Sequence, residues 1–167
     1  MTEQSKKTEE ENRKLEHEQK LEKFLHDMDE IDDRILQQIK ELSDSCKTAH
    51  EINKNELDLE IVRTISDMHR YNTMLAENRA NLAKLARQKD VIHGDLYEKY
   101  SRNFQVKLDT KYEIEEWLNR NPKWQKISAY YNNQKILVDY LQDIVKVLHT
   151  KTYAIKYIIE NKKIELS

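Results

Sequence analysis

Glycine and proline are almost absent from this chain, with one residue of each among 167. Tight turns use both residues heavily, because glycine reaches positive φ and proline presets a turn. A chain nearly without them has few turns, so its secondary-structure elements must be few and long. Charged residues make up 36% and apolar residues 38%, a balance typical of long exposed helices. We therefore predict an all-α fold of long helices.

Apolar residues recur at steps of three and four along most of the chain, which is the spacing of one helix face. After a polar segment 1–14, expected to be disordered or a fraying helix, the pattern predicts an acidic, amphipathic N-terminal helix within 15–55. A break is expected near 47–56. A second helix follows within a basic region, 56–120. Gly94 lies inside it, where glycine costs about 1 kcal/mol relative to alanine, and we expect it to mark a kink or a close approach.

The end of the basic region predicts a change of structure. Residues 101–109 lose the helical period and are expected to form an extended linker or a single strand. Asp109 or Thr110 can then cap a short helix that runs to about Asn119. Asn121 and Pro122 predict the start of the last helix. The asparagine accepts free backbone N–H groups, and proline fits the first helical position because its missing N–H would have no partner there.

The last helix, within 121–167, has the most regular pattern in the chain. One stripe runs in steps of three and four from Trp124 to Lys162, and a second stripe lies beside it. A two-stranded coil needs one stripe, so two stripes need neighbours on both sides. We expect a coiled-coil-like oligomerisation helix, with a ring as the natural closed assembly. The predicted oligomer interface is Trp124, Ile127, Tyr131, Val138, Leu141, Val145, Leu148, Ile155 and Ile159.

No pattern typical of a catalytic site is visible. The six histidines are scattered without the His-Glu-x-x-His spacing of a helical zinc site, and one glycine cannot build a phosphate-binding loop. We expect no enzyme, no metal and no cofactor. The single cysteine, Cys46, excludes an internal disulfide. The chain shows no secretory signal and no run of about 18 apolar residues, so we expect a cytoplasmic protein.

The net charge of −2 conceals an asymmetry between the two parts of the chain. Residues 1–60 hold 10 Lys and Arg against 18 Asp and Glu, whereas residues 61–167 hold 19 against 13. Binding of single-stranded nucleic acid needs cations for the phosphates and aromatic rings on which bases stack. Both occur together around residues 79–111, where the aromatic residues are Tyr71, Tyr97, Tyr100, Phe104 and Tyr112.

Six cations of this stretch are the candidate DNA-binding residues: Arg79, Lys84, Arg87, Lys89, Lys99 and Arg102. In a ring, each copy would repeat the patch, and many weak phosphate contacts would add by avidity. The alternative is a structural coiled-coil scaffold or adaptor without DNA binding. In that case the lysines solvate a helix and the tyrosines pack between helices.

The order of short motifs in the C-terminal part resembles a known family. Tyr100-Ser101 is followed by Phe104 to Asp109, by Leu141 to Lys146, and by Tyr153 to Ile158. In this order and spacing the chain resembles the UvsY-like recombination mediator family of T-even-type bacteriophages, over about residues 65–167. The resemblance implies a non-enzymatic protein that binds single-stranded DNA as a ring formed through C-terminal helices. It also implies that the protein helps load a recombinase onto strands coated by single-strand-binding protein, in the cytoplasm of the infected bacterial cell.

The chain departs from the family pattern in one place that matters for DNA. The family carries a Lys-x-Arg-Leu motif just before its Tyr-Ser pair, and this chain has His93-Gly94-Asp95-Leu96 there. The DNA contact therefore cannot be assigned to those positions, and the cations on either side of them become the expected contacts. Residues 1–55 have no counterpart in the resemblance.

Overall fold

The computed structural model of the chain describes residues 3–49, 51–102 and 110–165. Side chains are described from Leu15 onward within these ranges, apart from residues 17–18, 21, 24–25, 28–29, 46–48 and 165. In this part of the chain there are helices but no strands: α1 (Glu3–Thr48), α2 (Leu57–Arg102), α3 (Lys111–Arg120) and α4 (Pro122–Glu165). The prediction of an all-α fold of long helices is confirmed.

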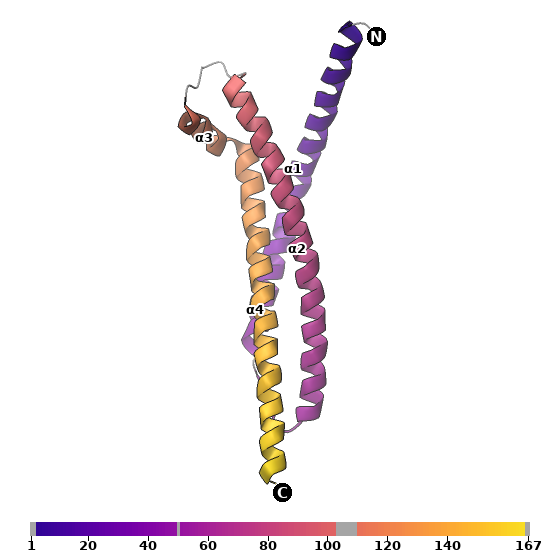
Figure 1. Ribbon diagram of the computed structural model, residues 1–167, viewed down its shortest axis with the longest axis vertical. Coiled ribbons are helices and arrows are strands. Elements are labelled where there is room, and N and C mark those ends of the chain that lie inside the picture. The colour runs from indigo at the N-terminus through magenta and orange to yellow at the C-terminus, as the bar shows by residue number, and fades with distance from the viewer. Residues whose placement is uncertain (1–2, 50, 103–109, 166–167) are drawn as a thin grey trace.

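The three long helices lie side by side, and α4 is the helix that the others share (Figure 1). Helix α2 packs antiparallel to α4 along most of its length. Helix α1 packs against another side of α4, and its N-terminal half leaves the bundle (Figure 1). The short helix α3 contacts both α2 and α4 at the end where α2 finishes and α4 begins.

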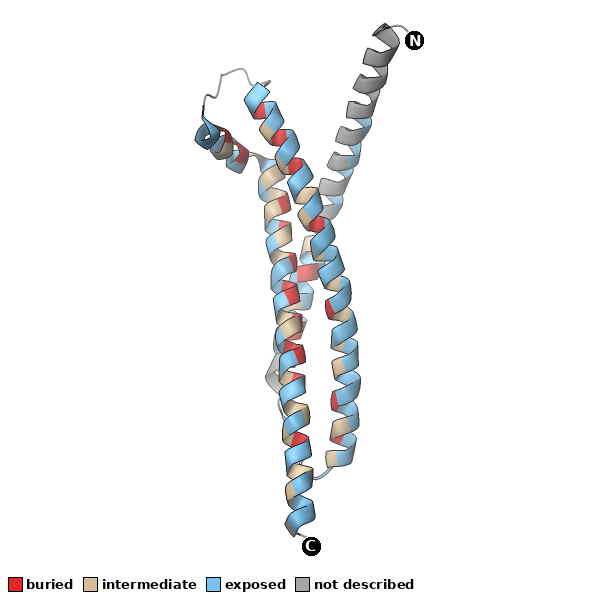
Figure 2. Ribbon diagram, viewed as in Figure 1, coloured by how far each residue is buried: buried red, intermediate tan, exposed pale blue. Residues whose placement is uncertain are grey.

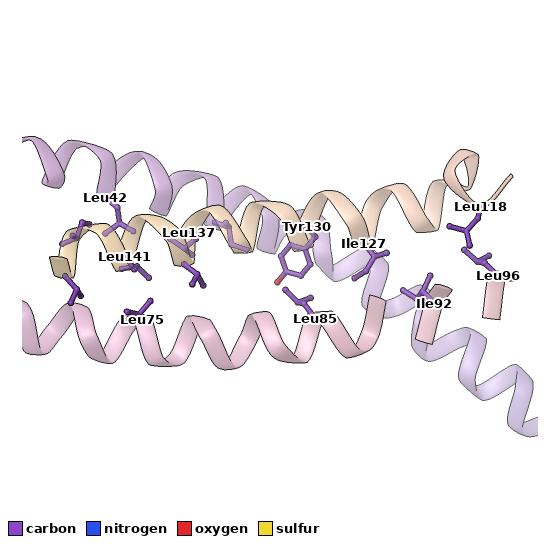
Figure 3. Close-up of a cluster of buried hydrophobic side chains, with 14 of the residues drawn as sticks. Leu42, Leu75, Leu85, Ile92, Leu96, Leu118, Ile127, Tyr130, Leu137 and Leu141 are labelled. Carbon is purple, nitrogen blue, oxygen red and sulfur yellow. The ribbon is translucent and has the colours of Figure 1, made fainter. Parts of the chain in front are cut away.

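The core forms along the contacts of α4 with its two long neighbours. Figure 3 shows Leu75 and Leu85 of α2 pointing toward α4, with Leu42 of α1 approaching α4 from its other side. Ile127 and Leu141 of α4 are fully buried between these helices. Burying apolar side chains in this way stabilises the packed helices by about 25 cal/mol per Å² removed from water. The buried positions follow the stripes of the sequence, and exposed residues cover the outer sides (Figure 2).

A buried polar contact fixes the register of α2 against α4. Gln134 is almost fully buried, and its side-chain amide donates to the side-chain oxygen of Asn78 at 2.8 Å. Because an unpaired amide would be costly to bury, sliding one helix along the other is disfavoured. This contact holds the two long helices in a single alignment.

The predicted starts of the two later helices are confirmed. Thr110, one of the two predicted caps, accepts the backbone N–H of Glu113 while the Glu113 carboxylate accepts the Thr110 N–H. The side-chain oxygen of Asn121 accepts the backbone N–H groups of Lys123 and Trp124. Each contact satisfies donors that the first turn of a helix leaves free.

The start of α1 and the end of α2 both extend into segments that were expected to be irregular. Helix α1 begins at Glu3, so the segment 1–14, expected to be disordered or a fraying helix, is helical from that residue. Helix α2 extends to Arg102, two residues into the predicted linker. The rest of that linker, with its predicted strand, lies outside the described residues.

Candidate nucleic-acid interface

Three of the predicted cations are exposed on α2, namely Lys84, Arg87 and Lys99. Lys84 and Arg87 are three residues apart and share one side of the helix, and Lys99 lies further along it, in the last turn. Within the described part of the chain, none of the three makes an ion pair or a hydrogen bond. We call these three residues the α2 cation row. Phosphate oxygens could therefore approach these cations without breaking an existing contact.

Two other predicted DNA-binding residues already have partners in the chain. The Arg79 guanidinium donates to the side-chain oxygen of Gln142 on α4, at 3.1 Å. The Arg102 guanidinium lies 2.9 Å from a carboxylate oxygen of Glu98, one turn earlier on α2. Both arginines are exposed, so a phosphate could reach them only in competition with these partners.

Lys89 takes a different position from the other predicted contacts. Its side chain is half-buried, and Nζ lies 5.0 Å from the centre of the Trp124 ring and 4.9 Å from that of Tyr131. A cation between two aromatic faces is held by their negative electrostatic potential. The structure therefore places Lys89 in the packing between α2 and α4 and not in the α2 cation row.

The aromatic residues around the basic stretch are mostly occupied inside the protein. Tyr100 is buried, and its hydroxyl accepts the side-chain amide of Asn121 at 2.8 Å. Tyr97 stacks on the His93 ring, with 6.1 Å between centroids, and Tyr71 is half-buried. Phe104 lies outside the described residues. Tyr112 alone among the four described rings is well exposed, at 77%.

Sequence analysis missed one exposed aromatic residue near the cations. Trp117 on α3 is exposed at 40%, and the Arg120 guanidinium carbon lies 5.9 Å from the centre of its ring. The signal was present in the sequence, since Trp117 and Arg120 are three residues apart on a helix, but it lay beyond the stretch rich in cations. Together with Tyr112, Trp117 gives α3 two exposed rings near the end of α2.

The segment around His93 has a role in packing. The His93 ring meets the Trp124 ring edge-on at 5.2 Å, and its Nε2 lies 3.6 Å from a carboxylate oxygen of Glu115 on α3. The Trp124 indole N–H donates to the side-chain oxygen of Asn119. These contacts hold α3 against the junction of α2 and α4, and so place Tyr112 and Trp117.

The residues predicted to form the oligomer interface are found inside a single chain. Most of them are buried against α1 and α2, whereas Trp124, Tyr131 and Ile159 are half-buried. The two stripes of α4 do need two neighbours, but the chain's own helices supply both. The contact between copies through these residues stays a prediction. The buried set comprises Ile127, Val138, Leu141, Val145, Leu148 and Ile155.

The described side chains hold no group of three or more His, Cys, Asp or Glu residues placed to bind a metal ion. In the same part of the chain, no helix is both long and apolar enough to cross a membrane.

The fold, over about three quarters of the chain, resembles that of one solved bacteriophage protein. That protein is the recombination mediator UvsY of bacteriophage T4, whose crystal structure matches this chain with a TM-score of 0.67 at 17% sequence identity. The match covers 77% of this chain and 97% of that one. No family model matches this chain, and no curated protein sequence matches it either. The shared fold agrees with the resemblance seen in the order of the sequence motifs.

Proposed function

We propose that this chain is a recombination mediator that binds single-stranded DNA as a ring-shaped homo-oligomer. In this role it helps load a recombinase onto strands coated by single-strand-binding protein, without catalysing a reaction, in the cytoplasm of a phage-infected cell. The observation that carries the proposal is the fold, shared with the T4 mediator over nearly all of that protein. The α2 cation row supports it independently.

The α2 cation row suits contacts to a DNA backbone. Binding to Lys84, Arg87 or Lys99 would break no internal ion pair, since none is made by the three in the described structure. Each phosphate contact releases a condensed counterion, which gives affinity that depends on salt and not on sequence. Tyr112 and Trp117 on α3 add exposed rings on which bases can stack.

A row of three cations is a weak site in one chain, and assembly would make it strong. Copies held together present several rows to one strand, and each contact after the first becomes intramolecular. The proposal therefore needs self-association. Because α1 and α2 cover the stripes of α4, the contact between copies uses exposed surfaces as long as both helices stay in place.

Fluorescence anisotropy with a labelled single-stranded oligonucleotide tests the DNA contact. Combined Lys84→Glu, Arg87→Glu and Lys99→Glu substitutions should weaken binding to all sequences alike. Each lost phosphate contact lowers the slope of log affinity against log salt by about 0.7, so the three together should lower it by about 2. The matched control reverses Lys20, Lys23 and Lys40, which are exposed on α1. It makes the same change in net charge and should bind nearly as the unaltered protein does.

A second measurement tests the mediator role itself. Addition of the protein should speed assembly of the phage recombinase on strands already coated by single-strand-binding protein. Equal loss of affinity in both triple variants would show that only total charge matters. A protein that self-associates but does not bind DNA at low salt would instead be the structural scaffold.

A further inference from the structure

One side of α4 faces α1 and carries no charged residue. Asn133 marks this side, because its side-chain amide donates to the Asp32 carboxylate of α1 at 2.9 Å. Residues three before Asn133 and four, seven and eleven after it share its side of the helix. With Asn133, these residues form what we call the α4 strip: Tyr130, Leu137, Tyr140 and Ile144. Leu137 and Ile144 are each 1% exposed, so the α4 strip would present apolar side chains to water if α1 were absent.

Helix α1 runs parallel to α4 along the α4 strip. Glu22 of α1 lies 3.8 Å from the Lys123 ammonium, and ten residues further along both helices Asp32 meets Asn133. Leu42 follows Asp32 by another ten residues, and Figure 3 shows it approaching α4 on the side away from α2. The C-terminal part of α1 therefore covers the α4 strip over its whole length.

The apolar contact of α1 with α4 is smaller than that of α2. Among the described side chains of α1, only Ile35 and Leu42 are buried, whereas buried apolar side chains of α2 recur from Leu75 to Tyr100. In the described part of the chain, α4 is also the only element that α1 approaches. Release of α1 would therefore break one interface and leave the α2–α4 pair and α3 as they are.

The polar contacts of α1 with α4 add little to its hold. The side chains of Glu22 and Lys123 are 70% and 40% exposed, and an ion pair in water contributes little to stability. Asp32 and Asn133 are half-buried, and after separation water can take the place of each partner. The least tightly held long helix thus covers a strongly apolar side of α4.

We propose that α1 is a removable, autoinhibitory cover, which keeps the α4 strip of one copy from binding the α4 strip of another. Two such strips meet without charge repulsion and bury apolar surface on both sides, whereas a nucleic acid would need cations there. Because only molecules with α1 released can make this contact, docking of α1 lowers the apparent affinity between copies. The inference rests on the proposed function for the premise that copies associate, and it adds what controls their association.

A covalent link between α1 and α4 tests the cover directly. Cys46 is first replaced by serine, then Asp32→Cys and Asn133→Cys are introduced together, and a short bismaleimide joins the two thiols within one chain. The linked protein should sediment as a monomer at concentrations where the unlinked protein forms assemblies. The matched control links Arg79→Cys to Gln142→Cys, at positions whose side chains meet at 3.1 Å. It ties α2 to α4, leaves α1 free, and should assemble as the unlinked protein does.

Loosening α1 should have the opposite effect. Ile35→Ser with Leu42→Ser removes the buried side chains of α1 and leaves every residue of α4 in place. The concentration at half assembly should fall by at least about tenfold, since the apparent affinity rises with the fraction of molecules whose α1 is released. The matched control changes the same residue types at exposed positions of α1, with Ile31→Ser and Leu36→Ser, and should assemble as the unaltered protein does.

The results separate failure of the cover from failure of the proposed function. Assembly of the protein linked between α1 and α4 would overturn the cover and leave the mediator role standing, with copies meeting through exposed surfaces. Links that join two chains would overturn it in favour of an α1 that packs on the α4 of a neighbour. A loosened protein without stronger assembly would show that α1 belongs to the core alone. If the unaltered, loosened and control proteins all remain monomers, self-association itself fails, and the ring fails with it.

Discussion

The Lys151 ammonium lies 2.6 Å from a carboxylate oxygen of Glu60, and both side chains are about nine-tenths buried. The pair joins α4 to the first turn of α2, beside the apolar core. Buried charges of opposite sign roughly offset the cost of their own dehydration, but removing one leaves the other unpaired. This contact therefore determines alignment more than it adds stability.

Lys151→Met should lower the free energy of unfolding by about 3 kcal/mol, because the Glu60 carboxylate would remain buried without a partner. The double variant Lys151→Met with Glu60→Leu should recover most of that loss. Urea unfolding of both proteins measures the difference. A single variant as stable as the unaltered protein would show that water reaches Glu60 and screens its charge.

Substitutions of Lys89 and Lys84 should have different effects, although both residues are lysines of α2. The first should change packing, and the second should change DNA binding. Lys89→Ala removes the cation between Trp124 and Tyr131 and should cost about 1 to 2 kcal/mol of stability. Lys84→Ala, on the exposed side, should leave the stability unchanged and weaken binding to the oligonucleotide. Thermal unfolding and anisotropy on the two variants test the distinction. The reverse assignment would place Lys89 in the DNA contact.

Asn121 serves two helices at once, which makes its replacement costly. Its side-chain oxygen caps α4 and its amide donates to the Tyr100 hydroxyl. Asn121→Ala should cost about 1 to 2 kcal/mol from the lost cap, with a further loss from the hydrogen bond. Tyr100→Phe removes the hydrogen bond alone and should cost about 1 kcal/mol. Chemical denaturation should rank the two variants in that order, and equal losses would show that the cap contributes nothing.

The buried phenol of Tyr130 should make the protein less stable at high pH. Burial raises the pKa of its phenol, and the negative charge of Asp32 raises that pKa further. Above about pH 10 the unfolded chain releases this proton while the folded chain keeps it. Stability should therefore fall as the pH rises from about 10 toward the folded pKa. Tyr130→Phe should make the decline shallower between pH 9 and 11 in urea unfolding, and Asp32→Asn should do so partly. A decline as steep in Tyr130→Phe as in the unaltered protein would assign it to other groups.

Local signals made much of the fold predictable from the sequence. The shortage of glycine and proline predicts few, long helices, and the caps at Thr110 and Asn121 lie within a few residues of the helix starts that they determine. Such signals act over one helical turn, so they survive in any tertiary context. The extent of α1 was less predictable, because the residues from Glu3 to Lys14 show no apolar stripe.

The partners of the stripes and of the cations could not be predicted, because they depend on which helices meet. Lys89 and Lys84 look alike in the sequence, yet one packs on rings of α4 and the other faces solvent. The stripe through Leu141 and Leu148 is the same whether its neighbour comes from the chain or from a second copy. Only the arrangement of α1 and α2 around α4 decides these cases.

Gly94 lies at a position of α2 where alanine should make the protein more stable. It lies within the continuous helix α2, its φ is not positive, and a Cβ built there would meet nothing within 4 Å. The close approach expected from the sequence is therefore not made within the described chain. Gly94→Ala should raise the free energy of unfolding by about 1 kcal/mol, because glycine loses more backbone entropy in a helix. Ala83→Gly, at an exposed position of the same helix, is the matched control and should lower it by a similar amount. Thermal unfolding of both variants measures the two shifts. A Gly94→Ala protein that is less stable than the unaltered one, with Ala83→Gly behaving as expected, would show that another molecule packs closely at this position.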